Sequence, residues 1–489
     1  MKKTCVCVAI LLTLVLLIAG CSQRVPEIEY SVKFVTNGGT KIAEIFGTIV
    51  MDCPVPELDG YVFEGWYEDA DFKTEQVTFP YTPQGQTTLY AKYINVAVGN
   101  EEIRYDYDTE GGFYIAKKYS GNSINVVVPD LYAGKPVSEI ASGFLDVTSR
   151  TERLYLGENV EKIETNFYLC PKFNEFILLK NSEFLSVEDG VLYDKNKTVL
   201  YCFPRNKKVD NDGIFTLPDT VKIVVKNAFR SVDGLRILNL GENTESIGED
   251  FSENKNLEKI NASGKFYYSD NGVLYNAEKT VLLAFPIKNS KNYTLLSTTE
   301  EIRENAFLNA ETVTLVLNSS LKIFNPQDNT NLTEIVVPSG NDYYTSVDGV
   351  LYDKGMTEII KYPENKQGEK FTLTGINSIG KNAFAFCKNL KILTINKEVE
   401  NIKQFAFFNS SLNEIIFEKD SELKVIDDTV FIMADDMQNL VLTATVPPEF
   451  NCEGLEIEFS ITVPAESYYA YIDAWGYLYL RIVRAESGE

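Results

Sequence analysis

The sequence has the residues for few kinds of catalytic chemistry. Its 489 residues include 70 Asp and Glu but no His, which excludes Ser-His and Cys-His nucleophiles, His-ligated zinc and imidazole acid–base catalysis. The stretch Asp106–Gly111 begins like a calcium loop, but Lys117 occupies the position of the bidentate Glu, and a hairpin turn explains the stretch better. A glycosidase-type carboxylate pair stays open, because the sequence gives no way to choose one. We predict no catalytic residue, no metal site and no cofactor.

One cysteine is placed for covalent modification. Lys2 and Lys3 precede an apolar run from Val6 to Ile18, which together have the form of a secretory signal peptide over residues 1–20. The segment Ile18–Cys21 resembles a bacterial lipobox, and the resemblance implies diacylation of Cys21. The alternative is an ordinary signal peptide with an incidental cysteine. We expect a protein exported to the bacterial cell surface, held in the membrane only by lipid at Cys21, with residues 21–27 as a tether.

The elements that follow repeat along the chain. A segment of Asp or Asn, Gly, Val, Leu, Tyr and Asp or Asn occurs three times, and an aromatic-Pro pair follows each Gly at the same distance. An Ala-Phe pair or a close variant also recurs about every 23 residues, within the range of leucine-rich repeats. The three segments are Asp189–Asp194, Asn271–Asn276 and Asp348–Asp353, and the pairs are Phe203–Pro204, Phe285–Pro286 and Tyr362–Pro363.

The residues around these phenylalanines carry a family resemblance. Ile379–Ile395 shows the full pattern, and Val399–Phe417 repeats it in the same order. This pattern resembles the BspA-type leucine-rich repeat over roughly residues 103–445. The resemblance implies a mainly β solenoid with short helical turns over residues 100–445. It also implies adhesin-like binding of a protein or glycan on a host or neighbouring bacterial surface.

The repeat pattern itself predicts which side chains form the core. In Leu-x-x-Leu-x-Leu the last three positions alternate inward and outward as in a short strand, and only stacked coils can bury the inward ones. We expect the phenylalanine of each Ala-Phe pair to be the largest core filler. The predicted inward ladders are Leu238 and Leu240, Leu315 and Leu317, Leu393 and Ile395, and Ile415 and Phe417, with Phe229, Phe307, Phe384 and Phe407 as fillers.

The outward strand positions are the candidate binding residues. One outward rung carries no charge although the protein is acidic, whereas the neighbouring rung contains Lys259, Glu334 and Glu414. The uncharged rung is either a shallow contact face for a protein or glycan, or packing between β-branched residues and stacked Asn side chains. Its members are Asn239, Asn261, Val316, Val336, Thr394 and Ile416.

The Gly-Val-Leu-Tyr segments are predicted to be inserts between coils. Asp-Gly before Val-Leu-Tyr indicates a turn and a strand, and Asp194–Lys197 supplies a second turn, so each insert is expected to form a β-hairpin. We favour a structural hairpin on the flank of the solenoid over a binding finger.

A separate unit is predicted before the array, over residues 28–95. Gly60–Tyr67, Asp71–Phe72 and Leu89–Tyr93 resemble the internalin-B-type B repeat, also called the Listeria–Bacteroides repeat. The resemblance implies a small β-grasp-like module, which usually serves as a spacer. One departure is Ile49–Pro56, which carries Cys53 and two prolines.

Composition and the C-terminal segment complete the prediction. The formal net charge of −24 disfavours nucleic acid and anionic lipid as partners. Residues 446–489 are expected to cap the last coil with a short aromatic helix, the alternative being a carbohydrate-stacking patch. The cysteines after Cys21 are expected to be buried free thiols. We conclude that the chain is a surface adhesin or ligand-binding protein and not an enzyme; the alternative is an envelope-associated glycan-acting enzyme or a scaffold of an enzyme complex.

Overall fold

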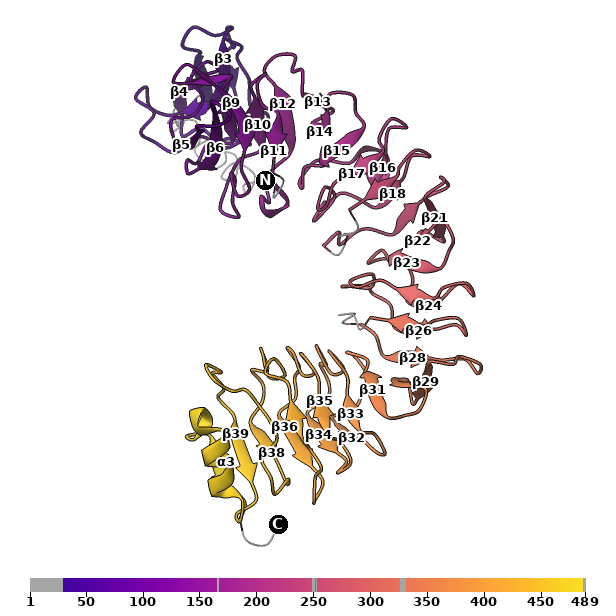
Figure 1. Cartoon of the computed structure of the whole chain (residues 1–489). Coiled ribbons are helices and arrows are strands. Elements are labelled where there is room, and N and C mark those ends of the chain that lie inside the picture. Colours follow the sequence, from indigo (N-terminus) through magenta and orange to yellow (C-terminus); the bar gives the residue numbers. More distant parts are fainter. Residues whose placement is uncertain (1–29, 165–166, 249–250, 252, 326–330, 487–489) are drawn as a thin grey trace, which may run out of the picture. The chain divides into compact units, whose positions relative to one another are not determined.

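The computed structural model describes residues 30–164, 167–248, 251, 253–325 and 331–486, and nearly all of its regular elements are strands (Figure 1). The predicted signal peptide, the tether and Cys21 lie outside the described residues. Two compact units are present, one of residues 30–101 with Ser123–Pro129, and one of residues 102–122 with 130–486. The boundaries predicted near residues 95, 100 and 445 stay predictions. No helix of the described part has the length and apolar character needed to cross a bilayer.

The first unit is a mixed four-stranded sheet in the order β2–β1–β4–β3. Its strands are β1 (Ser31–Val35), β2 (Ile45–Phe46), β3 (Tyr61–Tyr67) and β4 (Gln86–Asn95). The central pair β1 and β4 is parallel and the outer pairs are antiparallel. This arrangement agrees with the predicted β-grasp-like module, although within residues 30–101 no helix covers the sheet.

The proline-containing segment of this unit is explained by its contacts. Trp66, which is fully buried, donates its indole N–H to the carbonyl oxygen of Pro54 at 2.6 Å. Val50 pairs with Tyr81 in an isolated bridge and is buried. The prolines therefore do not disturb the core, because their carbonyls still accept hydrogen bonds.

The second unit begins with the predicted hairpin and two small sheets. β5 (Ile103–Asp108) and β6 (Phe113–Tyr119) are antiparallel and pair Asp108 with Phe113, so a hairpin turn does account for the calcium-like stretch. The next elements are β7 (Asn125–Val128, grouped with the first unit), β8 (Leu131–Tyr132), β9 (Lys135–Ile140), β10 (Arg153–Leu156), β11 (Lys162–Ile163), η1 (Phe167–Leu169) and β12 (Glu175–Leu178).

After residue 178 most coils contribute one strand to each of two faces of parallel strands, which the inserts divide into separate sheets. We call the first the strand face. It consists of β16 (Ile214–Thr216), β18 (Ile237–Asn239) and β20 (Lys259–Asn261); then β24 (Asn292–Thr294), β26 (Thr314–Val316) and β28 (Glu334–Val336); then β32 (Lys370–Thr372), β34 (Ile392–Ile395), β36 (Glu414–Phe417), β38 (Asn439–Val441), β39 (Ser460–Val463) and β40 (Ile482–Arg484).

The second sheet, the lateral face, has shorter strands. They are β17 (Ile223–Val224) and β19 (Ser246–Ile247); β25 (Glu301–Ile302) and β27 (Ile323–Phe324); and β33 (Ser378–Ile379), β35 (Asn401–Ile402) and β37 (Val425–Ile426). The only helix in the described part of this array, apart from the cap described below and η1, is α2 (Asp210–Gly213).

The core lies between these two sheets, as the repeat pattern predicts. All eight predicted inward positions are buried, and Phe229, Phe307, Phe384 and Phe407 are 0–3% exposed. The rings of successive coils lie above one another, with centroids 5.8 Å apart between Phe384 and Phe407. The fold class and the repeat register are therefore confirmed.

The inserts are larger and more deeply buried than predicted. Each is a three-stranded antiparallel meander whose third strand continues into the lateral face. The middle strand is buried on both sides, so the insert lies within the core and not on its flank. The strands are β13 (Leu185–Glu188), β14 (Val191–Asp194) and β15 (Val199–Cys202); β21 (Tyr267–Asp270), β22 (Val273–Asn276) and β23 (Val281–Ala284); and β29 (Tyr344–Val347), β30 (Val350–Asp353) and β31 (Glu358–Lys361).

The Asp-Gly or Asn-Gly turn of each insert also ends a section of the strand face. Asp189 and Gly190 have φ values of 46° and 74°, as a two-residue type I′ hairpin turn requires. The carbonyl of Gly190 accepts a hydrogen bond from Phe176 at 3.0 Å, and a Cβ on this glycine would lie 2.7 Å from Glu175. The other two inserts bond to β20 and β28 in the same way. The glycine is therefore needed both for its φ and for its close approach to the preceding coil.

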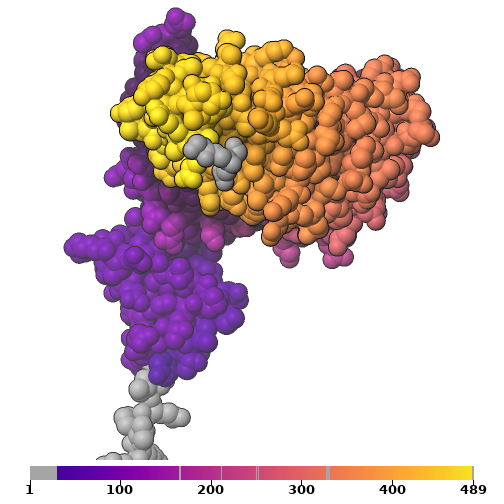
Figure 2. Space-filling view, turned by 90° about the horizontal axis from the view of Figure 1, so that it is seen from below, coloured from indigo at the N-terminus to yellow at the C-terminus, as the bar shows by residue number. Residues whose placement is uncertain are grey.

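The C-terminal segment caps the array as predicted. The helix α3 (Tyr468–Ala474) and the turn η2 (Gly476–Leu478) lead into β40. Tyr471 and Trp475 are buried, and they donate hydrogen bonds to the carbonyls of Ala444 and Pro448. Figure 2 shows the coils following one another from orange to yellow, with the cap at the yellow end.

Four of the five described cysteines are buried, as expected. Burial raises the pKa of the Cys202 and Cys387 thiols well above the usual range and that of Cys170 to about 12. The exception is Cys53, which is exposed in the first unit. The expectation of buried thiols was wrong at this position, because Cys53 lies in the proline-containing segment outside the sheet.

Candidate binding surface

The six predicted binding residues lie on the strand face but do not form one ladder. Asn239 pairs with Asn261, Val316 with Val336, and Thr394 with Ile416, each pair in a different sheet. All six are partly exposed, as outward positions should be. The ladder is interrupted because an insert ends each of the first two sheets.

The longest uninterrupted ladder is on the last sheet, which has six strands in the order β32–β34–β36–β38–β39–β40 (Figure 1). Parallel pairing aligns one outward residue from each strand, and Val483, the last of them, is 47% exposed. None of the six is charged, and all of them are β-branched: three are Thr, two are Val and one is Ile. We call this row the uncharged ladder, and it comprises Thr372, Thr394, Ile416, Val441, Thr462 and Val483.

The asparagine part of the predicted rung satisfies its own hydrogen bonds. Asn261 Nδ2 donates to Asn239 Oδ1 at 2.8 Å, and Asn239 Nδ2 donates to Thr216 Oγ1 at 2.9 Å. This chain of bonds supports the structural alternative for the first sheet, because the amides already have partners. The uncharged ladder differs, since most of its side chains carry only methyl groups and hydroxyls.

Charged residues border the uncharged ladder on the neighbouring outward rung. Lys370 pairs with Ile392, Ile392 with Glu414, and Glu414 with Asn439. Asn439 then donates to Glu414 Oε1 at 3.3 Å and accepts from Thr462 at 3.0 Å. A partner on the ladder would therefore meet an apolar and hydroxyl strip beside a polar, hydrogen-bonding edge.

A cavity of about 280 Å³ lies beside the first insert, and two of its charged residues pair with each other. Asp189, Lys207, Lys208 and Asp210 are among its lining residues. Lys207 Nζ lies 2.9 Å from the Asp189 carboxylate. The residues that correspond to Lys207 in the other repeats, Asn289 and Lys366, donate to the carbonyl of the same turn residue. We therefore interpret the cavity as a result of the contacts that hold each insert in place.

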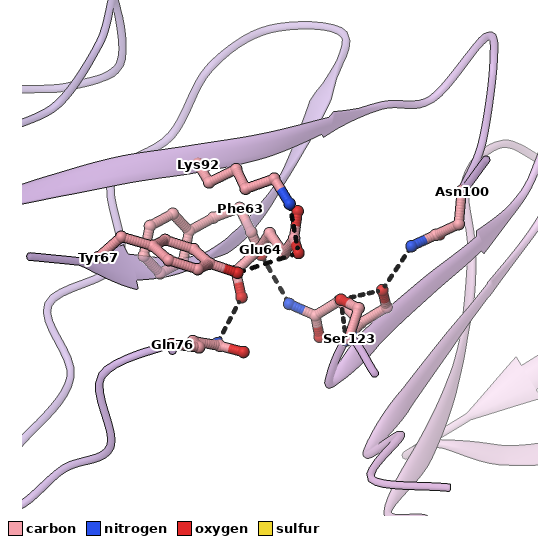
Figure 3. Close-up of polar contacts among 8 residues, drawn as sticks. Phe63, Glu64, Tyr67, Gln76, Lys92, Asn100 and Ser123 are labelled. Atoms are coloured by element: carbon pink, nitrogen blue, oxygen red, sulfur yellow. Dashed lines mark hydrogen bonds and ion pairs between the residues drawn. The ribbon is translucent and has the colours of Figure 1, made fainter. Parts of the chain in front are cut away.

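The first unit contains the most connected polar cluster (Figure 3). Glu64, 8% exposed, accepts hydrogen bonds from Tyr67 at 3.2 Å and Lys92 at 3.1 Å, and its carbonyl accepts from Gln76 at 2.8 Å. Every one of these contacts joins strands or loops of the same sheet. We interpret the carboxylate as structural, because Lys92 and Tyr67 already satisfy it.

The second half of this cluster fastens Ser123–Pro129 to the sheet. Asn125 Nδ2 donates to the carbonyl of Phe63 at 2.6 Å, and Ser123 Oγ donates to the carbonyl of Asn125 at 2.8 Å (Figure 3). Asn100 Oδ1 accepts from the Val127 amide at 2.7 Å. Among the described residues, no group of Cys, Asp and Glu side chains is arranged to hold a metal ion.

Sequence reasoning missed four members of the uncharged ladder, namely Thr372, Val441, Thr462 and Val483. A signal was present in Ile461–Val463, which alternates apolar and polar residues, whereas Ile482–Arg484 shows no such alternation. These segments were assigned to the terminal element, so their role as two further strands of the same sheet was not recognised.

Comparison with protein families gives two matches. The BspA-type leucine-rich repeat region matches in 6 copies over residues 200–291, 284–367 and 364–448, which is about half of the chain. The Listeria-Bacteroides repeat domain matches residues 30–92. Both resemblances stated from the sequence are confirmed.

Individual relatives are similar over shorter stretches. A protein of Evansella cellulosilytica named as a membrane protein is 33% identical over 112 residues, which cover 20% of this chain and 15% of that protein. A Gly-rich membrane protein of the same organism is 40% identical over 78 residues, or 14% of this chain and 8% of that protein. The chain therefore spans only a small part of these relatives.

Two solved structures are similar at low identity. A leucine-rich cell surface protein from Faecalibacterium prausnitzii is 17% identical with a TM-score of 0.34, covering 80% of this chain and 94% of that one. A leucine-rich repeat protein from Eubacterium ventriosum is 19% identical with a TM-score of 0.38, covering 60% and 81%.

Proposed function

The chain belongs to the BspA-type leucine-rich-repeat family, and from this premise we propose that it is a lipid-anchored bacterial surface protein that binds a protein or glycan through its strand face and catalyses no reaction. The uncharged ladder carries this proposal. Charged residues make up 24% of the sequence, yet six successive outward positions on one sheet have none. A partner can displace water from a surface of Thr, Val and Ile at a low free-energy cost, because no charged group has to lose its hydration.

The anchoring and the lack of catalysis rest on separate support. Cys21 follows a signal-like segment and has the lipobox-like sequence before it, which supports a lipid anchor. The Asp189 carboxylate of the cavity at the first insert is paired with Lys207, which supports binding over catalysis. The proposed partners lie on a host or neighbouring bacterial surface, and the acidic surface disfavours nucleic acid.

Charge insertion on the ladder tests the binding face. The chain from residue 22 is immobilised and exposed to arrays of extracellular proteins and bacterial glycans. Thr394→Lys combined with Val441→Lys introduces two charges separated by Ile416, so that the lysines do not face each other directly. We expect at least tenfold weaker retention of the bound partner, because each lysine must lose its water on contact.

A matched control distinguishes loss of the surface from loss of the fold. Val425, 37% exposed on the lateral face, pairs with Asn401 and can receive the same substitution. Val425→Lys should retain full binding, and all variants should keep the thermal midpoint of the parent. Unimpaired binding by the ladder variant would remove the strand face as the site, and turnover of a glycan that one Asp or Glu substitution abolishes would replace binding by catalysis.

A further inference from the structure

The turns of three successive coils near the C-terminus present apolar side chains where the coils of Phe229 and Phe307 have mainly polar ones. Each turn flanks the buried phenylalanine of the Ala-Phe pair or its variant, at Phe384, Phe407 and Phe431. In the earlier coils the corresponding turns contain Arg230 and Ser231, or Leu308 and Asn309. We call the apolar set in the last three coils the turn ridge, and it consists of Phe386, Phe405, Phe408, Ile432 and Met433.

The side chains of the turn ridge lie close together and remain accessible. The Phe408 ring is 5.3 Å from Phe386 and 5.9 Å from Phe405, both edge to face. The Phe386 amide donates to the Phe408 carbonyl at 2.9 Å, which joins the two turns. Ile432 and Met433 occupy the equivalent places in the third turn and are 36% and 53% exposed. Phe386, Phe405 and Phe408 are partly exposed, and a group of accessible apolar side chains on successive turns marks an interaction site.

Three members of the turn ridge occupy backbone positions that favour asparagine. Phe386, Phe405 and Met433 have φ values of 60°, 55° and 55°. Equivalent turn positions in other coils hold Asn305, Asn309, Asn382 and Asn409, also at positive φ. Asparagine tolerates this region and bulky side chains do not. Local stability therefore does not explain the aromatic and Met residues, whereas a contact surface does.

The charges around the turn ridge indicate the chemistry of its partner. Lys381 and Lys388 flank the first turn, and the equivalent positions of the third turn are Asp428 and Asp435, which are exposed. The surface is thus apolar in the middle, basic at one end and acidic at the other. An anionic lipid surface or an acidic glycan complements only the basic end, whereas a protein segment can complement both.

We infer that the turn ridge is a second binding surface, which accepts a protein segment with apolar anchor residues between an acidic and a basic end. This surface is independent of the strand face, because its residues lie in the turns and not on outward strand positions. The interaction would bury the exposed Met433 and Ile432 side chains, and its ends would align by charge.

Synthetic peptides test this inference on the chain from residue 22, which retains every described residue. The first peptide has leucines at helical spacing with glutamates at one end and lysines at the other. The second has the same leucines with glutamates at both ends, and the third has the charges of the first with serines in place of leucines. We expect fluorescence anisotropy to show binding of the first peptide that is at least tenfold tighter than that of the other two.

The decisive variant is Phe386→Asn with Phe405→Asn and Met433→Asn. It should bind the first peptide at least tenfold more weakly, while its thermal midpoint stays within about 2 °C of the parent or rises, because asparagine suits positive φ. Ile223→Asn with Ile323→Asn removes two exposed apolar residues of the lateral face and should leave binding unchanged. Failure of the first peptide to bind, or equal binding by the triple variant, would overturn the inference, as would a triple variant that loses binding only because it unfolds.

Discussion

A buried ion pair next to the third insert allows the energetics of the array to be tested quantitatively. Lys361 Nζ lies 2.8 Å from Glu364 Oε1, and the two side chains are 1% and 0% exposed. Both groups have lost their hydration, and chiefly their mutual attraction offsets that cost. The second repeat has the apolar residues Ala284 and Ile287 at the same two positions, and both are buried. The second repeat therefore shows how an uncharged version of this site packs.

Single and double substitutions should have opposite effects. Lys361→Ala or Glu364→Ile alone leaves one buried charge without its partner, which costs about 3–5 kcal/mol. The double variant K361A/E364I reproduces the second repeat and should be as stable as the parent, or more stable by about 1–4 kcal/mol. Since stability in repeat arrays is largely local, we expect the effect to be confined to the neighbouring coils.

Cys387 provides a native reporter of local opening. It is 1% exposed, its Sγ lies 3.9 Å from the Tyr362 carbonyl oxygen, and burial raises the pKa of its thiol. Thiol labelling followed by peptide mass spectrometry separates it from the other cysteines. The single variants should label Cys387 faster by roughly two to three orders of magnitude, since about 1.4 kcal/mol corresponds to a factor of ten. Labelling within threefold of the parent, or a double variant as fast as the single ones, would refute this account of the pair.

Three further predictions concern other parts of the chain. Phe407→Ala should cost about 3–5 kcal/mol, with hydrogen-exchange protection lost in the last coils but kept around Phe229; a uniform loss would contradict local stability. Asn125→Ala removes the bond to Phe63 and should destabilise the first unit by about 1–3 kcal/mol, measured by Trp66 fluorescence in a Trp475→Phe background, and an unchanged midpoint would show that Ser123–Pro129 is not fastened there. Cys21→Ala should abolish incorporation of a labelled fatty acid into the full chain, and equal labelling of both forms would end the lipid-anchor proposal.

The repeat register was predictable because it depends on periodic burial. Each coil buries its strand residues and its phenylalanine against the next coil. The same apolar pattern therefore recurs in every repeat, and the copies can be compared with one another. Leu238, Leu315 and Leu393 are thus correctly placed from sequence alone. The same reasoning found the hairpin at Asp108 and the aromatic cap at Trp475.

Features that depend on contacts between distant segments could not be predicted. The docking of Asn125 onto β3 involves a polar side chain at the start of the short strand β7, with no periodic signal. The charges of Lys361 and Glu364 conflict with the apolar pattern of their positions, so the pattern gave no reason to bury them. The outward rung is divided among three sheets because the insert glycines form hydrogen bonds with the last strand of each of the first two sheets. Only the structure reveals these hydrogen bonds.

The inserts did contain a signal that was interpreted incompletely. Three consecutive apolar residues, Val273 to Tyr275, cannot belong to a strand with one solvated face, because alternate side chains point in opposite directions. In the structure Leu274 packs into the core that precedes it, while Val273 and Tyr275 pack into the core that follows. Leu351 and Val350 divide in the same way between the second core and the third.

The middle strands of the second and third inserts are therefore walls shared by two neighbouring cores, and this has a consequence for cooperativity. A coil without an insert contacts its neighbours through the two parallel sheets, the stacked phenylalanines and hydrogen bonds between turns, such as that of Phe386 to Phe408. An insert adds a strand whose two faces belong to different cores, so loosening one core removes packing from the wall of the next. The buried Tyr275 and Tyr293 hydroxyls, 2.7 Å apart, add a polar bond on one side of such a wall.

The uncharged ladder and the turn ridge both lie on the last section, beyond the third insert, where six strands form one sheet without interruption. An effect of binding there reaches the preceding section through the third insert, whose middle strand belongs to both the second and the third core.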